Sequence, residues 1–66
     1  MPCFVELTDK QEDLNILVDL SKVLVVTHLR DGTTKLETDN SEIEVHEGYK
    51  VIKKVMQDSG LIGGEV

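Results

Sequence analysis

Residues 23–45, VLVVTHLRDGTTKLETDNSEIEV, decide the fold, because they alternate strand-like runs with two turn signals. Asp31-Gly32 lies between two of these runs, and an Asp-Gly pair supplies the positive φ angles that tight hairpin turns require. A second turn is expected at 39–41, where three small polar residues follow one another. The stretch therefore predicts three antiparallel strands, at 23–29, 34–38 and 42–46.

The first of these strands is apolar on both of its faces. Leu24, Val26 and His28 share one face, and valines occupy the other. A strand with two apolar faces is typical of the centre of a sheet. We therefore expect a helix to cover one face and further sheet or a second subunit to cover the other, with Leu24, Val26 and His28 as a candidate partner-binding surface.

Two further strands are expected before this stretch, at 3–7 and 14–20, joined by an exposed polar loop at 8–13. In the second strand, Leu14, Ile16, Val18 and Leu20 share a face. Helical spacing is an alternative there, since Leu14, Leu17, Val18 and Ser21 also satisfy it. The β-branched residues and the length of seven residues favour a strand. Residues 19–22 are expected to form a turn or a single helical turn.

The C-terminal third predicts one helix, at 47–58. Tyr49, Ile52, Val55 and Met56 recur at intervals of three and four residues and form its apolar stripe. Glu47 is expected in the first turn, where the helix dipole favours an acid. Gly60 suits the left-handed position after a helix, and residues 60–66 are expected to form a loose tail.

These elements predict the fold class: a single small α+β domain over residues 1–66, with about five short, mostly antiparallel strands and one C-terminal helix packed on the sheet. A chain of this size buries only about 60% of its unfolded surface, so the core is small. The expected core consists of Val5, Leu7, Ile16, Val18, Val23, Val25, Leu36, Ile43, Val45, Ile52 and Val55.

The composition restricts the function classes. The 66 residues carry a net charge of −6 and a single cysteine, Cys3. An acidic chain is poorly suited to phosphate backbones, so nucleic acid is not an expected partner. One cysteine permits no internal disulfide, which fits a reducing compartment. Without a basic, apolar leader or an apolar run of ~18 residues, we expect a cytoplasmic protein with no membrane partner.

Candidate chemical groups are few. His28, His46 and Cys3 lack the spacing of metal ligands, so no metal or cofactor is expected. Carboxylates at outward positions of strands offer no pocket that separates their pKa values, so we predict no catalytic residues and no enzyme activity. Glu42, Glu44 and His46 share an outward face, which we interpret as a second candidate partner-binding surface.

The order of strands, the hairpin at Asp31-Gly32 and the run Ile43-Glu44-Val45 before a helix resemble the FlbD-type small flagellar and phage accessory proteins. That resemblance implies a small β-rich accessory protein. The run from Ile43 to Glu47 before a helix is also similar to the carbon storage regulator family, which implies a strand-exchanged dimer that binds RNA. The basic residues that family uses in its first strand and after its Val-His pair are replaced here by acids and glycine.

We therefore predict a non-enzymatic protein-interaction module of bacterial or phage accessory type, which binds a protein partner or a second copy of itself. Two alternatives stay open. One is a nucleic-acid-binding regulator with the carbon storage regulator architecture, for which Lys50, Lys53 and Lys54 supply a small basic patch. The other is a small metal-binding protein.

Overall fold

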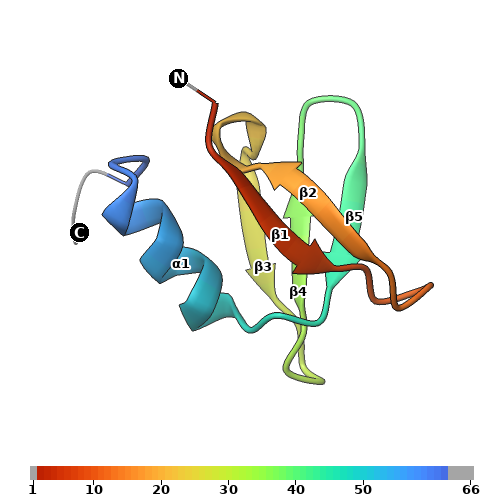
Figure 1. Cartoon of the computed structure of the whole chain (residues 1–66). Coiled ribbons are helices and arrows are strands. Elements are labelled where there is room, and N and C mark those ends of the chain that lie inside the picture. The colour runs from red at the N-terminus through yellow and green to blue at the C-terminus, as the bar shows by residue number, and fades with distance from the viewer. Residues whose placement is uncertain (1, 63–66) are drawn as a thin grey trace.

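The computed structural model describes residues 2–62. It contains five strands, one turn of 3-10 helix and one α-helix (Figure 1). In chain order these are β1 (Phe4–Thr8), β2 (Asn15–Asp19), η1 (Leu20–Lys22), β3 (Val25–His28), β4 (Thr34–Glu37), β5 (Glu42–Val45) and α1 (Tyr49–Asp58). The strands form two antiparallel sheets, β1-β2 and β3-β4-β5, so the predicted α+β fold class is confirmed.

The β1–β2 hairpin lies across one face of the three-stranded sheet, and α1 lies beside β3 (Figure 1). Val5 pairs with Val18 and Leu7 with Ile16, which places these four apolar side chains on the inner face of the hairpin. The predicted helical turn after β2 is η1, where Asp19 caps the N–H of Ser21. The turn redirects the chain from the hairpin to the second sheet.

The β3–β4 turn has the predicted Asp-Gly chemistry. Gly32 has a φ of +91°, and the N–H of Leu29 donates to the carbonyl of Thr33 at 2.9 Å. Such a three-residue loop with glycine in the left-handed region is a common hairpin connection. The Asp31 carboxylate fixes the turn by accepting bonds from the N–H and the hydroxyl of Thr33, at 3.0 and 2.6 Å.

The prediction that residues 23–29 form a central strand is wrong. The sheet order is β3-β4-β5, so β3 is an edge strand and β4 is central. The central strand buries only one face, through Thr34 and Leu36, because Lys35 and Glu37 point the other way. Hydrophobicity on both faces of β3 therefore does not mark a central strand in this fold.

The two sheets are joined where β1 meets β5. Asp9 forms a β-bridge with Val45, the N–H of Lys10 donates to the carbonyl of Glu44 at 2.9 Å, and the N–H of His46 donates to the carbonyl of Thr8 at 2.9 Å. The prediction of an exposed loop at 8–13 is therefore wrong at its start. Thr8 belongs to β1, and the next two residues are half-buried against β5.

The core lies between the hairpin, the second sheet and the helix, and its fully buried apolar members are Leu7, Leu20, Leu36, Val45 and Ile52. Six other predicted core residues pack against them while keeping partial exposure: Val5, Ile16, Val18, Val23, Ile43 and Val55. Val25 is a wrong prediction, since it is 48% exposed on the face of β3 opposite Val26. Leu20 and Thr34 were not predicted as core residues, although both are fully buried.

The helix begins later than predicted. Gly48 is its N-cap and Tyr49 its first residue, so Glu47 lies before the helix rather than in its first turn. The helix ends as predicted: Gly60 has a φ of +75°. The N–H groups of Gly60 and Leu61 donate to the carbonyls of Gln57 and Met56, the two bonds of a Schellman motif. Of the predicted loose tail at 60–66, residues 63–66 lie outside the described residues.

Candidate binding groove

Of the three predicted partner-binding residues around β3, two are exposed and one is packed against the core. Leu24 precedes the strand and is 69% exposed, whereas Val26 packs against the core. The ring of His28 stacks on Tyr49 of α1, with 5.9 Å between ring centroids and 18° between planes. The helix therefore contacts the end of this face through Tyr49, and both Leu24 and His28 are exposed on it.

Of the three predicted residues along β5, Glu44 and His46 form polar contacts with the neighbouring loops. Lys10 Nζ lies 3.2 Å from Glu44 Oε1 and 2.6 Å from Asp31 Oδ2. These hydrogen bonds, Asp31 first, raise the pKa of Lys10, and the Lys10 ammonium holds the pKa of Asp31 well below its usual range. His46 Nε2 lies 2.6 Å from Asp13 Oδ1. Two of the three residues thus fasten the β1–β2 loop to β5, and Glu42 stays exposed.

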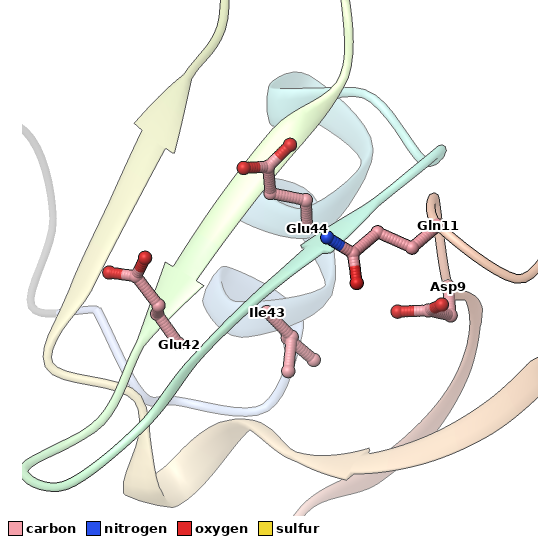
Figure 2. Close-up of a pocket in the computed structure, with 5 residues that line it drawn as sticks. All are labelled: Asp9, Gln11, Glu42, Ile43 and Glu44. Atoms are coloured by element: carbon pink, nitrogen blue, oxygen red, sulfur yellow. The ribbon is translucent and has the colours of Figure 1, made fainter.

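A small depression of about 140 Å³ lies beside this loop, lined by Asp9, Gln11, Glu42, Ile43 and Glu44 (Figure 2). In Figure 2 the carboxylates of Glu42 and Glu44 point to one side of β5, and the side chain of Ile43 points to the other. Because Ile43 also lines a larger groove, the depression and that groove meet at β5.

The larger groove has a volume of about 380 Å³ and lies between β2 and the β4–β5 hairpin. Its apolar lining comes from both sheets and consists of Ile16, Leu17, Val18, Val23, Leu36 and Ile43. Its polar lining consists of Asp19, Lys22, Thr38, Ser41 and Glu42. An apolar surface with a few polar groups at its margin is the usual composition of a binding site.

The polar groups at the two ends of the groove are held in place by local hydrogen bonds. Asp19 Oδ1 accepts from the hydroxyl and the N–H of Ser21, at 2.6 and 3.0 Å, and from the N–H of Cys3 at 2.9 Å. These bonds, that of the Ser21 hydroxyl first, lower the pKa of Asp19, so its carboxylate is ionised at neutral pH. At the other end, the hydroxyls of Thr38 and Ser41 lie 2.9 Å apart.

Sequence reasoning missed this groove, and its best signal was Leu17. Alternation places Leu17 on the outward face of β2, where Asn15 and Asp19 are polar. Leu17 is 69% exposed, and Phe4, diagonally across the hairpin, is 62% exposed. An apolar residue at an outward position of an edge strand is a sign of a contact surface. The groove itself depends on how the two sheets diverge, which no local pattern encodes.

The other candidate groups are placed as follows. The Sγ of the half-buried Cys3 lies 3.2 Å from the hydroxyl oxygen of Ser59. On α1, Lys50 and Lys54 are exposed, and Lys54 Nζ lies 3.8 Å from Asp58 Oδ2. Among residues 2–62, no three histidine, cysteine or acidic side chains gather as a metal site would require. In the same range, no helix has the length and apolarity needed to cross a membrane.

The architecture defines the chain as a small α+β domain of two antiparallel sheets and one helix. Comparison of the chain with protein-family models, with curated proteins and with solved structures finds no match. The resemblances to FlbD-type proteins and to the carbon storage regulator family therefore stay predictions, and the groove is the feature of the described residues that points to a function.

Proposed function

We propose that this protein is a non-enzymatic protein-interaction module that binds a partner in the groove between β2 and β5. The observation that carries the proposal is an apolar groove, formed by both sheets, beside the exposed side chain of Leu17. Large apolar side chains in such a position lose contact with water when a partner covers them, which contributes about 25 cal/mol for each Å² of apolar surface buried.

The groove offers contact surface and few reactive groups. Its hydroxyls, on Thr38 and Ser41, bond to each other, and one oxygen of the Asp19 carboxylate accepts three local hydrogen bonds. These groups suit the margin of an interface, where polar side chains surround an apolar centre. The proposal includes the bacterial or phage accessory setting that the resemblance implies and the cytoplasmic location expected from the sequence.

Two substitutions with matched exposure test the proposal. Leu17 lines the groove and Leu24 does not, yet each side chain is 69% exposed. We would immobilise the wild-type protein, Leu17→Asp and Leu24→Asp, and compare the proteins that each captures from cells that produce this chain. We expect at least one protein to bind the wild type and Leu24→Asp but not Leu17→Asp.

The other outcomes count against the proposal in different ways. Loss of capture in Leu24→Asp alone would move the site to the β3 surface that the sequence predicted. Equal capture by all three would exclude both surfaces. A wild-type protein that captures nothing and stays monomeric over a concentration series would overturn the interaction function itself.

The nucleic-acid alternative is tested with the same samples. A labelled RNA mixed with the wild-type protein at low salt should give no binding if the proposal holds, because the electrostatic attraction to phosphate is strongest at low salt. Binding that weakens in Lys50→Glu, but not in Leu17→Asp, would favour the regulator instead.

A further inference from the structure

We propose that the groove receives an extended segment of the partner, which adds to the open edge of β2 as a further antiparallel or parallel strand and alternates apolar with basic side chains. This inference rests on the proposed function and deepens it, because it specifies both the conformation and the chemistry of the bound segment.

The hydrogen bonds of the hairpin determine which backbone groups of β2 are directed outward. The N–H of Asp9 donates to the carbonyl of Leu14, and the N–H of Leu20 donates to the carbonyl of Cys3, at 2.8 and 2.9 Å. Even-numbered residues of β2 therefore bond to β1. Since the backbone direction alternates along an antiparallel strand, the N–H and C=O groups of Asn15, Leu17 and Asp19 point away from β1.

Among the described strands, β2 pairs with β1 alone, so its other edge is available along the whole strand. The groove lies along this edge, because Ile16, Leu17, Val18 and Asp19 all line it. An added strand at that position would lie over Ile43, on the side of β5 that faces the groove. Strand addition supplies affinity through main-chain hydrogen bonds and specificity through alternate side chains.

The alternation follows from the two sides of the added strand. Side chains that point inward would meet the apolar lining from Ile16, Val18 and Ile43, so every second residue of the bound segment should be apolar. Side chains that point outward would lie beside Leu17 and Asp19, which share the outward face of β2, and basic residues with long aliphatic stems fit there.

Charge decides between a foreign partner and a second copy of the chain. The groove is lined by two acids, Asp19 and Glu42, and by one base, Lys22. Asp19 lies on β2 itself, beside the edge that would receive the added strand, and the chain as a whole carries a net charge of −6. Two copies would repel each other, whereas a basic segment would be attracted. We therefore assign the groove to a basic segment.

The test uses two synthetic peptides of about six residues, the usual length of a strand. One alternates valine with lysine, and the other alternates valine with glutamate. In an NMR titration of the isotope-labelled protein, the lysine peptide should shift the amide signals of β2 and of Ile43. The protein should bind the glutamate peptide roughly tenfold more weakly. The affinity for the lysine peptide should fall between roughly 20 and 200 mM salt.

Strand addition is tested separately from charge. Leu17→Pro and Leu17→Ala both replace the leucine side chain, but only proline also removes the outward N–H. Proline is tolerated on an edge strand where its missing N–H would point away from the neighbouring strand. We expect weaker peptide binding by Leu17→Pro than by Leu17→Ala. If Leu17→Pro does not fold, a lysine peptide with N-methyl groups at alternate positions removes hydrogen bonds from the ligand side and should lose affinity against the wild-type protein.

Several results would overturn the inference. They are equal binding of the two peptides, binding of neither, equal affinity of the N-methylated and plain peptides, and association of two copies through β2 that strengthens with salt. Failure here is distinguishable from failure of the proposed function: a partner captured through Leu17 in cells, combined with no peptide binding, would keep the interaction module and reject the basic strand.

Discussion

Glu47 ties the end of β1 to the connection between β5 and α1: its carboxylate accepts the N–H of Thr8 at 2.8 Å and the Thr8 hydroxyl at 3.0 Å. Burial acts to raise the pKa of Glu47, but the bonds from Thr8 and from the backbone N–H of Glu47, with the nearby His46, together outweigh it, and the pKa lies below its ordinary value of 4.5. A residue that the sequence placed in the helix therefore acts as a clamp between the two sheets.

Replacement of Glu47 by glutamine should destabilise the protein at neutral pH by about 1 kcal/mol, since the bonds to a charged acceptor are partly screened by solvent. Because the folded pKa is depressed, the carboxylate stabilises the fold above about pH 4.5, and this contribution is lost as pH falls through the folded pKa. Denaturant unfolding between pH 7 and pH 3 should show that the free energies of unfolding of the wild type and of Glu47→Gln become equal in acid. A difference in free energy of unfolding that stays the same at every pH would contradict this role of the Glu47 carboxylate.

The buried Thr34 supports the same connection from β4. Its side chain has no exposed surface, and its hydroxyl donates to the carbonyl of Glu47 at 2.8 Å. Thr34→Val keeps the shape but leaves that carbonyl without its donor, which should cost about 1–3 kcal/mol. Thr38→Val, which removes a hydroxyl from an exposed turn, is the matched control and should change stability by less than about 0.5 kcal/mol. If urea unfolding shows the same loss of stability in Thr34→Val and Thr38→Val, the hydrogen bond from Thr34 to Glu47 does not stabilise the fold as proposed.

Leu20, in the 3-10 turn, should contribute as much to the stability of the fold as any residue of the two sheets. Its side chain is 1% exposed, whereas that of Leu24 is 69% exposed. Leu20→Ala should cost about 2–5 kcal/mol by opening a cavity in the core. Leu24→Ala should stay within about 0.5 kcal/mol of the wild type. Thermal unfolding followed by circular dichroism compares the two, and a tolerated Leu20→Ala would mean that the core does not depend on the turn.

Serine substitutions at two glycines of the helix ends should have opposite signs. Gly48 is the N-cap, has an extended backbone and makes no side-chain capping bond, so Gly48→Ser should stabilise by a few tenths of a kcal/mol. Gly60 has a φ of +75°, where any side chain is strained, so Gly60→Ser should destabilise by about 1 kcal/mol. Melting temperatures that move in the same direction would contradict the assigned caps.

The sequence predicted the features that depend on neighbours in the chain. The Asp31-Gly32 turn, the alternation of β5, the helical turn after Asp19 and the left-handed Gly60 are all local, and all are present. The apolar stripe of the helix also places Ile52 correctly in the core.

The errors concern features that depend on distant segments. The position of β3 at an edge, the exposure of Val25 and the burial of Leu20 follow from how the hairpin, the second sheet and α1 pack. Glu47 was misplaced because the sequence alone does not distinguish an acid in the first turn of a helix from an acid just before the helix that bonds to a distant donor such as Thr8. The groove was missed for the same reason, since its two walls come from different sheets.

The long-range closure between β1 and the end of β5 has a consequence for the order of folding. Its bonds join residues 39 positions apart, whereas β3, β4 and β5 follow one another through short turns. Closing a longer loop costs more entropy, and contacts of high sequence separation tend to slow folding. We expect the three-stranded sheet to form early and the first hairpin to dock late. Glu47→Gln should then accelerate unfolding in a chevron measurement and leave the refolding rate almost unchanged.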